Sequence, residues 1–340
     1  MRQAVMTEPG KIAFYDVEEP RALEPNEILL KIERIGVCGS DIHVYHGKHP
    51  FTPYPVVQGH EYSGTVVKIG ADVKKVRVGM LATARPQLVC GKCNPCKRGQ
   101  YNVCSELRVQ GFQAPGCAQD FFIVPEDRVV AIPENMTADQ AALVEPSSVG
   151  AHATKIVGDI KGKNVVVSGA GTIGNLIAQF ALIRGAKTVL ITDFSAFRLQ
   201  KALDCGIHFA ANLKEERFED AVKRAFGGEG FQIGFEAVGV QAALTALINN
   251  IEKGGSVGII GVYEEEPRIN MGFVCEHELT INGSMMYLQE DYEETVTAIS
   301  DGRLKTEPLI TGHFPFEQYL AAYKHIDERG EFTLKTMIDM

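Results

Sequence analysis

Residues 165–174 read VVVSGAGTIG and decide the fold of the second half of the chain. An apolar run of strand length passes directly into a Gly-x-Gly-x-x-Gly turn, and an apolar helical stretch follows at 175–184. This strand, turn and helix context is what a dinucleotide fingerprint requires. Free N–H groups at the start of such a helix hold phosphate. We expect five residues of this turn and helix start to contact the cofactor: Gly169, Gly171, Thr172, Ile173 and Gly174.

Asp193 indicates which nucleotide the turn binds. It ends the next apolar run, about 20 residues beyond the glycine turn, where a carboxylate accepts hydrogen bonds from the adenosine ribose. A 2′-phosphate beside this carboxylate would meet like-charge repulsion. Arg198 is the next basic residue, a turn of helix further on, and we count it among the cofactor contacts. The sequence therefore favours NAD over NADP.

Strand-like and helical patterns alternate from Gly162 onwards. This alternation predicts a parallel, doubly wound Rossmann sheet and hence an α/β fold, which we assign to residues 148–286. The apolar runs expected to form its strands lie at 164–168, 188–193, 232–236, 256–262 and 280–284.

The first part of the chain has a different sequence pattern. Short apolar runs such as 27–32 and 62–70 alternate with Gly and Pro, which predicts a β-rich domain over residues 1–147. We expect the C-terminal segment, residues 287–340, to return to this domain. Two helices and a strand are expected in that segment, at 291–301, 317–329 and 334–338.

A short lobe at about residues 88–106 contains four cysteines: Cys90, Cys93, Cys96 and Cys104. This lobe is rich in Gly, Pro, Lys and Arg and cannot form a core of its own. Four thiolates suit tetrahedral zinc and leave no open coordination position, which predicts a structural zinc site. An iron–sulfur cluster and a nucleic-acid-binding zinc ribbon are the alternatives.

A second group of metal ligands comes from two separated loops. Cys38 lies in one loop, and His60 and Glu61 lie together in the other. Thiolate, imidazole and carboxylate are mixed ligands that suit a catalytic zinc with one position left for water or substrate. Glu145 lies where the β-rich part of the chain meets the part with alternating strands and helices. It is either a further ligand or a helix-capping charge.

Bulk composition excludes several classes of protein. The net charge of the 340 residues is −9, and the basic residues are scattered, so neither nucleic acid nor an anionic membrane is an expected partner. No apolar run approaches the roughly 20 residues that cross a bilayer, and the first residues lack a signal-peptide core. We expect a cytoplasmic protein. Eight cysteines in that compartment favour metal binding over disulfides, and three isolated ones are expected to be buried: Cys117, Cys205 and Cys275.

In this order and spacing, the motifs resemble the zinc-containing medium-chain dehydrogenase/reductase (alcohol dehydrogenase) family, and within it the polyol and sorbitol dehydrogenase branch. The resemblance covers essentially the whole chain and includes Glu-Pro-x-Ser-Val-Gly at 145–150. It implies a GroES-like catalytic domain, NAD, and one catalytic and one structural zinc per subunit. It also implies homodimers or homotetramers joined through the cofactor domain.

The resemblance also implies roles for individual residues around the catalytic metal. Cys38, His60 and either Glu61 or Glu145 would bind the catalytic zinc. The zinc would polarise the oxygen of a hydroxylated small molecule and lower the pKa of its hydroxyl group.

Further roles concern the proton and the nicotinamide. By resemblance, Ser40 would begin a proton relay that reaches solvent through the nicotinamide ribose and His43. Val262 and Met285 would contact the nicotinamide half of the cofactor, which accepts the hydride.

These expectations describe an NAD-dependent zinc dehydrogenase for a secondary alcohol of a polyol, sugar acid, cyclitol or related carbohydrate. Met286-Tyr287 stands where sorbitol dehydrogenases often carry Arg-Tyr, so sorbitol itself is not the expected substrate. A threonine or simple-alcohol dehydrogenase is the alternative within the class, and a non-catalytic zinc-stabilised binding protein is the alternative outside it. Arg85 is interpreted as a surface arginine, with contact to a carboxylate or hydroxyls as its alternative.

Overall fold

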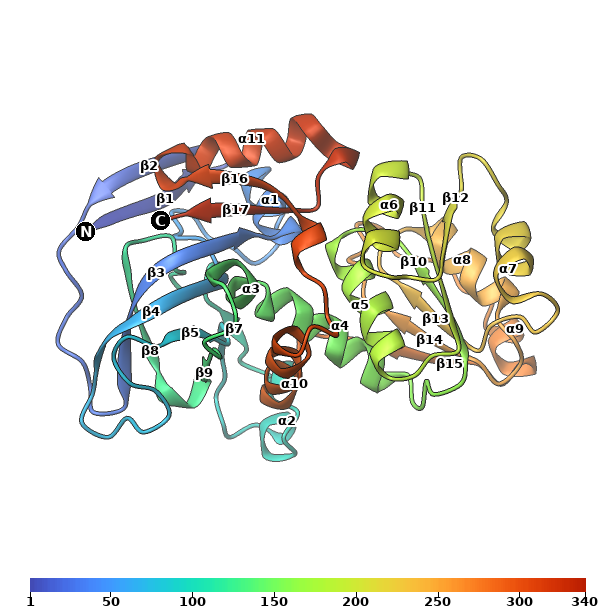
Figure 1. The fold of residues 1–340 in the computed structure, drawn as a ribbon, viewed down its shortest axis with the longest axis horizontal. Coiled ribbons are helices and arrows are strands. Elements are labelled where there is room, and N and C mark those ends of the chain that lie inside the picture. The colour runs from blue at the N-terminus through green and yellow to red at the C-terminus, as the bar shows by residue number, and fades with distance from the viewer. The chain divides into compact units, whose positions relative to one another are not determined.

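The computed structural model describes all 340 residues, and the chain divides into two compact units (Figure 1). The first unit contains Met1–Glu145, Leu288–Ser300 and Ile310–Met340. The second unit contains Pro146–Tyr287 and Asp301–Leu309. The chain therefore passes twice from the first unit into the second and twice back again.

The C-terminal segment is divided between the units, which differs from the expectation that all of 287–340 returns to the first domain. Residues Asp301–Leu309 belong to the second unit. The reason is a pair of hydrogen bonds between the Gln179 side chain and the Lys305 backbone, 2.8 Å to its N–H and 3.0 Å to its carbonyl.

The second unit is built on a six-stranded parallel sheet, which confirms the predicted Rossmann fold. Its strands lie in the spatial order β12-β11-β10-β13-β14-β15, the order of a doubly wound dinucleotide-binding sheet. The strands are β10 (Asn164–Ser168), β11 (Thr188–Asp193), β12 (Phe209–Asn212), β13 (Ile233–Glu236), β14 (Ser256–Ile259) and β15 (Thr280–Gly283). The strand order reverses between β10 and β13, where ligands bind in folds of this kind.

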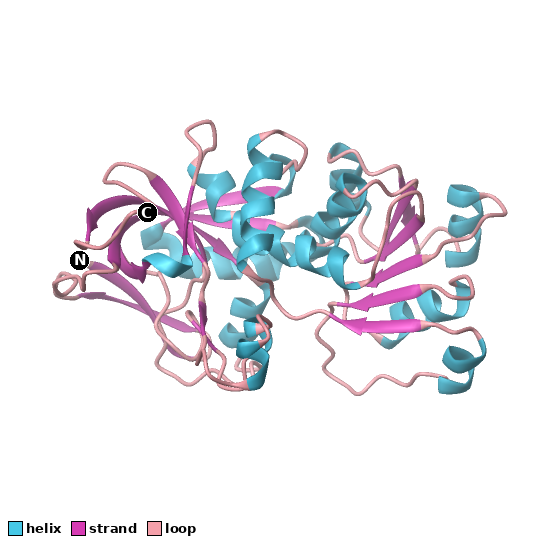
Figure 2. Ribbon diagram, turned by 90° about the horizontal axis from the view of Figure 1, so that it is seen from below, coloured by secondary structure: helices cyan, strands magenta, loops and turns pink.

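Helices cover both faces of this sheet (Figure 2). Side chains alternate along β10, so Val165 and Val167 enter one apolar cluster and Val166 enters another. A strand buried on both faces must be apolar throughout, which explains the continuous valine run. The helices of this part are α4 (Val144–Ile156), α5 (Thr172–Ile183), α6 (Ala196–Asp204), α7 (Phe218–Phe226), α8 (Gln241–Asn250) and α9 (Met271–Glu276).

In the second unit, two strands differ clearly from the sequence-based expectation. The strand β12 was not expected, because Phe-Ala-Ala-Asn at 209–212 lacks the β-branched residues that mark a strand. The strand β14 ends at Ile259 rather than at Val262. It stops there because the N–H groups of both Ile260 and Gly261 donate to the same acceptor, the carbonyl of Glu236. Regular pairing with β13 therefore ends at this point.

The first unit contains a seven-stranded sheet in which β3 pairs with β4, β8 and β17. Its strands are β3 (Glu27–Val37), β4 (Glu61–Ile69), β5 (Leu81–Ala84), β8 (Phe121–Pro125), β9 (Val129–Ala131), β16 (Ile310–Pro315) and β17 (Lys335–Asp339). Two small ladders join β1 (Arg2–Glu8) to β2 (Lys11–Asp16) and β6 (Gln87–Leu88) to β7 (Arg108–Val109). Both chain termini lie in this β-rich unit (Figure 1).

Short helices connect and cover these strands. They are α1 (Gly39–Tyr45), α2 (Asn94–Lys97), α3 (Ala138–Ala142), α10 (Gln289–Ser300) and α11 (Tyr319–Arg329). Single turns of 3-10 helix occur at Tyr101–Val103, Glu126–Arg128, Glu307–Leu309, Phe316–Gln318 and Gly330–Phe332. None of the helices combines the length and the apolar character that crossing a bilayer requires.

Strand pairing in the first unit brings distant residues together. The register of β3 against β4 places Gly36 opposite Glu61, and the register of β17 against β3 places Thr336 opposite Val37. The end of β3, the start of β4 and the start of β17 therefore meet at one place. Cys38 follows β3 directly at this point.

Candidate functional site

The predicted mixed ligand set comes together at the end of β3. One ligand atom each from Cys38, His60 and Glu61 lies within 4.8 Å of the other two. Gly36 makes room for this group, because a Cβ atom at that position would lie 2.3 Å from Glu61 Oε2. Thiolate, imidazole and carboxylate at this spacing fit a zinc ion.

His60 is buried, with 5% of its surface exposed, and its Nδ1 atom has no hydrogen-bond partner within the protein. Asp41 Oδ1 is the nearest carboxylate oxygen, 3.6 Å from that nitrogen. Burial lowers the pKa of His60, but the charges of Asp41 and Cys38 raise it more, so that it lies well above its usual value. The group is therefore an anionic environment that stabilises a cation.

Asp41 is a site residue that the sequence analysis did not single out. Its side chain is buried, and Oδ2 accepts a hydrogen bond of 2.9 Å from the Cys38 backbone N–H. Gln58 donates to Oδ1 from 3.4 Å. A carboxylate behind a ligating histidine is the usual way of orienting the imidazole. Its position between Cys38 and His43 was the available signal, but spacing alone did not separate it from a helix-capping aspartate.

Lys335 is a second site residue that the sequence did not indicate. Its buried ammonium group donates to both Glu61 oxygens, at 2.6 and 2.7 Å, and to the Val37 carbonyl at 3.1 Å. Burial lowers the pKa of Lys335, but the charges of Glu61 and Cys38 outweigh it and raise the pKa. The carboxylate of Glu61 is thus held by a cation on the side of β17.

Glu145 does not belong to the compact ligand group. It is buried in the first turn of α4, and its negative charge raises the pKa of Lys335. The three donors that come together are those of Cys38, His60 and Glu61. The structure therefore places Glu61 in the group and Glu145 outside it.

Ser40 and His43 both lie on α1, which starts immediately after Cys38. Both side chains are partly exposed. Neighbouring histidines have other contacts: His46 Nε2 lies 2.8 Å from Asp327 Oδ2, and the ring of His49 stacks on Phe112 at 4.8 Å. His46 and His49 therefore make structural contacts with neighbouring segments.

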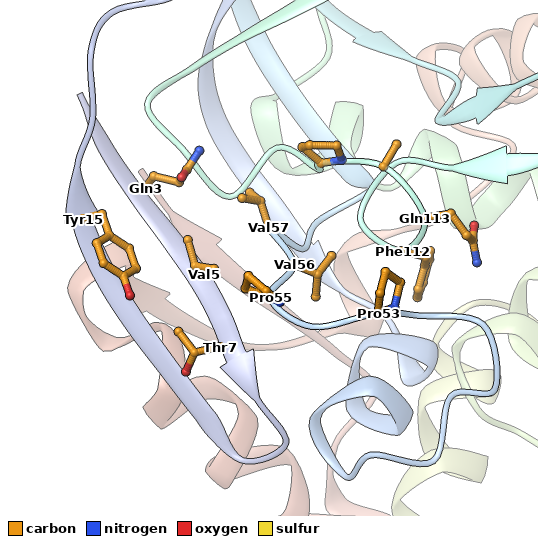
Figure 3. Close-up of a pocket in the computed structure, with 12 residues that line it drawn as sticks. Gln3, Val5, Thr7, Tyr15, Pro53, Pro55, Val56, Val57, Phe112 and Gln113 are labelled. Atoms are coloured by element: carbon orange, nitrogen blue, oxygen red, sulfur yellow. The ribbon is translucent and has the colours of Figure 1, made fainter.

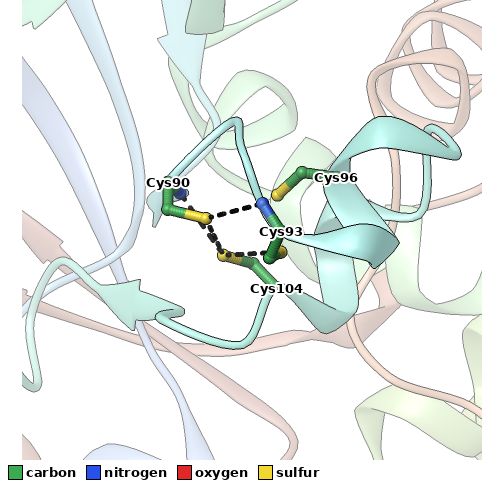
Figure 4. A group of neighbouring side chains, drawn as sticks. All are labelled: Cys90, Cys93, Cys96 and Cys104. Atoms are coloured by element: carbon green, nitrogen blue, oxygen red, sulfur yellow. Dashed lines mark hydrogen bonds between the residues drawn. The ribbon is translucent and has the colours of Figure 1, made fainter.

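The four cysteines of the lobe converge on one point (Figure 4). The sulfur of Cys104 lies 3.5 Å from that of Cys90 and 3.9 Å from that of Cys93. Four sulfurs at about 2.3 Å around a tetrahedral zinc lie about 3.8 Å apart, so the observed spacing fits the ion. Backbone N–H groups of Cys96 and Ser105 lower the pKa of Cys93 to about 6, which favours the thiolate.

The three isolated cysteines differ in their exposure to solvent. Cys117 and Cys205 are buried, as expected, and burial raises the pKa of each thiol. Cys275 is exposed on α9, so the expectation of burial is wrong for this residue. A short helix at the surface can carry a cysteine without packing it, and the sequence contains no signal for this.

The glycine turn has the geometry that its sequence predicts. Gly169 adopts a φ of 102°, and a Cβ atom there would lie 2.8 Å from Val238. A Cβ atom on Gly174 would lie 1.8 Å from the Gly169 carbonyl oxygen, so only glycine permits this helix and strand contact. Gly171 precedes the first residue of α5, Thr172, and a Cβ atom on it would meet nothing within 4 Å. The backbone at this end of the helix is open to a phosphate.

Asp193 ends β11 beside this turn. Its Oδ2 accepts a hydrogen bond of 2.7 Å from Ala170 N–H, within the turn itself. Its Oδ1 accepts from the N–H groups of Phe194 and Ser195 at 2.7 and 2.9 Å. These bonds fix the carboxylate at the edge of the glycine turn. Arg198 follows in α6, where Ser195 Oγ accepts from its N–H group.

Val262 and Met285 lie on the loops that follow β14 and β15. Their exposed fractions are 73% and 45%, so part of each side chain is accessible at the surface of these loops. Glu236, which the sequence analysis missed, is fully buried at the end of β13 and accepts hydrogen bonds from the N–H groups of Val238 and Gly239. These bonds fix the loop after β13. The backbone of Val262 packs closely against that loop, because a Cβ atom on Gly239 would lie 2.3 Å from the Val262 carbonyl oxygen.

A hollow of about 550 Å³ lies between β1 and the loops at 53–57 and 112–115 (Figure 3). Val5, Pro53, Pro55 and Phe112 give it largely apolar walls. The ring of Phe112 also lies 4.9 Å from the ring of His60. The hollow contains none of the three clustered ligands, so the reactive groups of this unit lie outside it.

Comparisons with known proteins identify the family of the chain. The family model for the alcohol dehydrogenase GroES-like domain matches residues 24–134, and the model for zinc-binding dehydrogenases matches residues 172–301. An L-threonine 3-dehydrogenase of Legionella pneumophila (strain Corby) is 32% identical over 322 residues, which is 93% of each chain.

Two solved structures share the fold over the whole chain. A short chain alcohol dehydrogenase from E. coli CFT073, complexed with NADH, has a TM-score of 0.92 and 27% identity and covers 100% of this chain and 99% of its own. Galactitol-1-phosphate dehydrogenase from Escherichia coli has a TM-score of 0.91 and 26% identity over 100% of both chains. The chain therefore belongs to the zinc-containing medium-chain alcohol dehydrogenase family and is an alcohol dehydrogenase that uses zinc and NAD or NADP.

Proposed function

We propose that this enzyme oxidises a secondary alcohol of a polyol, sugar acid, cyclitol or related carbohydrate with NAD. The alcohol and NAD⁺ give the ketone, NADH and one proton. The observation that carries the reaction class is the compact group of Cys38, His60 and Glu61 ligand atoms within 4.8 Å. A mixed ligand set of this kind leaves a coordination position for the substrate oxygen.

The residues of the first unit have distinct tasks in this proposal. Cys38, His60 and Glu61 hold a catalytic zinc, with Glu145 as the alternative carboxylate ligand, and the four-cysteine lobe holds a structural zinc. When bound, zinc lowers the pKa of the substrate hydroxyl and the nicotinamide accepts the hydride. Asp41 orients His60 through its carboxylate, which lies 3.6 Å from the imidazole.

Ser40 and His43 carry the proton away. They are three residues apart on α1, so their side chains are neighbours on one face of the helix. Ser40, two residues after the metal ligand Cys38, receives the hydroxyl proton, and His43 passes it to solvent. An imidazole both accepts and releases protons near neutral pH.

The choice of NAD rests on Asp193. Its carboxylate is fixed beside the glycine turn by three backbone N–H groups, where a ribose hydroxyl can donate to it. A 2′-phosphate at the same position would be repelled. Thr172 and Ile173 begin α5, and Arg198 lies on α6. In this proposal all three contact the pyrophosphate or ribose of the cofactor.

The test is NADH formation across a panel of alditols, aldonates, uronates, cyclitols, L-threonine and short alcohols. The zinc-loaded enzyme is compared with its Cys38→Ser variant. Turnover of carbohydrate-type substrates, lost in the variant, is the expected result. Turnover confined to threonine or short alcohols would overturn the substrate class.

An L-threonine 3-dehydrogenase is the second candidate, because a protein of that name is 32% identical over 93% of the chain. The same panel separates the two candidates. A protein that binds zinc and NAD and turns over no member of the panel would point to a substrate outside the panel or to a non-catalytic binding protein.

We further propose that the enzyme is a cytoplasmic homodimer or homotetramer that joins through the cofactor-binding unit. The supporting observation is that β15 forms an edge of the parallel sheet with Thr280 and Gly283 exposed. Such an edge presents unpaired backbone groups to a second chain. Light scattering after size exclusion measures the state, and a monomer at all concentrations would contradict the proposal.

A further inference from the structure

Two arginines are buried next to each other in the first unit. Arg85 has 7% of its surface exposed and Arg128 has 8%, so the interpretation of Arg85 as a surface residue is wrong. The two are adjacent across the sheet, because the backbone N–H of Arg85 donates to the Arg128 carbonyl at 3.1 Å. In return, the Arg128 guanidinium donates to the Arg85 carbonyl at 3.4 Å.

All hydrogen-bond partners of these guanidinium groups are neutral. Arg85 donates to the amide oxygens of Gln289 and Gln87 and to the backbone carbonyl of Asp127. Arg128 donates to the amide oxygen of Gln110 at 2.9 Å and to the backbone carbonyl of Arg85. Neither arginine forms an ion pair with a carboxylate. Neutral acceptors satisfy N–H donors, but they do not offset the two positive charges.

Two buried positive charges without a salt-bridge partner have an electrostatic cost. Burial lowers the pKa of Arg128, and the nearby charge of Arg85 lowers it further. Tyr62 and the Asp127 carboxylate act in the opposite direction but do not cancel the effect. Buried charges in proteins are normally paired, so two adjacent guanidinium groups without a carboxylate form an arrangement that an anion would stabilise.

A short loop links the arginine pair to residues of the candidate metal centre. Gln110, which accepts from Arg128, is followed by Gly111 and Phe112. A Cβ atom on Gly111 would lie 3.2 Å from the backbone of Gly59, and the Phe112 ring lies 4.9 Å from the His60 ring. One short loop thus connects the arginine pair to a zinc ligand.

We propose that Arg85 and Arg128 form an anion subsite, and that the substrate is a hydroxylated molecule carrying a carboxylate or a phosphate monoester. This inference rests on the proposed function and narrows its substrate class. Planar guanidinium forks match the geometry of carboxylate and phosphate oxygens. The anionic group is held at Arg85 and Arg128, and the hydroxyl to be oxidised lies toward Cys38 and His60.

The competing interpretation is that the arginines only brace the lobe. Arg85 lies over the ring of Tyr101 at 4.9 Å, and the Tyr101 hydroxyl accepts from the Gln289 backbone N–H. A purely structural role predicts that removing a guanidinium lowers stability and affects all substrates equally. An anion subsite predicts an effect that depends on the charge of the substrate.

The experiment compares substrates that differ only in the anionic group. D-Galactonate is paired with galactitol, and galactitol 1-phosphate with the same neutral partner, for the wild type, Arg85→Gln and Arg128→Gln. We expect KM for the preferred anionic member to rise about tenfold to hundredfold in each variant, the cost of losing a charged hydrogen bond. The KM of its neutral partner and kcat should stay near the wild-type values. The first pair tests a carboxylate and the second a phosphate.

Controls separate this proposal from stability effects. Arg108→Gln removes an exposed arginine on β7, two residues before Gln110, and should change nothing. Arg128→Lys keeps the charge and should retain a preference for the anionic partner. Equal effects on anionic and neutral partners, or a wild type without preference for the anion, would overturn the subsite.

Calorimetric binding of inorganic phosphate and D-galactonate to the zinc-loaded enzyme provides a readout that does not need turnover. Binding should be lost in Arg85→Gln and Arg128→Gln and kept in Arg108→Gln. No turnover of any panel substrate would defeat the proposed function, whereas binding that persists in both variants would defeat only the subsite. If Arg128→Gln does not fold, Arg85→Gln decides the question.

Discussion

The ammonium group of Lys335 lies 2.6 and 2.7 Å from the two carboxylate oxygens of Glu61, although the residues are 274 positions apart in the chain. Both side chains are almost completely buried. Glu61 also belongs to the ligand group with Cys38 and His60. A carboxylate in this position has two cations that can hold it, the lysine and a bound metal, so metal binding and Lys335 are energetically coupled.

The first prediction follows from this coupling. Lys335→Met removes the ammonium and leaves the Glu61 carboxylate buried without a partner, which costs about 3–5 kcal/mol when no metal is present. Bound zinc compensates for this loss. We expect the metal-free variant to unfold at a clearly lower temperature than the wild type, and zinc to stabilise the variant more than it stabilises the wild type.

Thermal unfolding with zinc and with a chelator measures both effects. Lys324→Met, which changes an exposed lysine on α11, is the matched control and should behave as wild type. An equal stabilisation by zinc in the wild type and Lys335→Met would show that the two cations do not share the carboxylate.

A second prediction concerns the orientation of the imidazole. Asp41→Asn keeps an acceptor for the Cys38 N–H but removes the charge that faces His60 Nδ1. We expect zinc affinity at this site to fall about tenfold to hundredfold, the usual cost of losing such a carboxylate. Competition with a fluorescent chelator measures it. Unchanged affinity would mean that His60 is held by packing against Phe112 alone.

Local spacing explains which parts of this site the sequence could predict. The glycine turn and the four-cysteine lobe consist of residues close together in the chain, so their geometry follows from short-range conformation. Cys38, His60 and Glu61 were also identified, because their residue types restrict the chemistry even before β3 and β4 are paired.

The partners of those residues depend on tertiary structure. Lys335 reaches Glu61 only because β17 pairs with β3, and nothing around residue 335 signals that pairing. Burial of Arg85 likewise depends on contacts with Gln289, more than 200 positions later. The strand β12 was missed for a different reason, since a short strand without β-branched residues has no local signature.

A third prediction tests the cofactor choice. Asp193→Asn keeps the size of the side chain and removes the charge that would repel a 2′-phosphate. We expect the ratio of kcat/KM for NAD to that for NADP to fall at least about tenfold, because the repulsion disappears and one ribose contact weakens. Steady-state kinetics with both cofactors gives the ratio. A ratio that does not change would assign the selectivity to other residues, such as Arg198 on α6.

The last prediction concerns the four-cysteine lobe. Cys104→Ser removes the sulfur that lies 3.5 and 3.9 Å from its neighbours, and a lobe without a core of its own depends on the metal to fold. We expect the zinc content to fall by about one ion per chain and proteases to cleave between residues 88 and 106. Cys275→Ser changes an exposed cysteine outside any ligand group and should retain full metal content and resistance. A Cys104→Ser protein with unchanged zinc content and an intact lobe would show that three sulfurs suffice, whereas loss of all zinc would show that the two metal groups fold together.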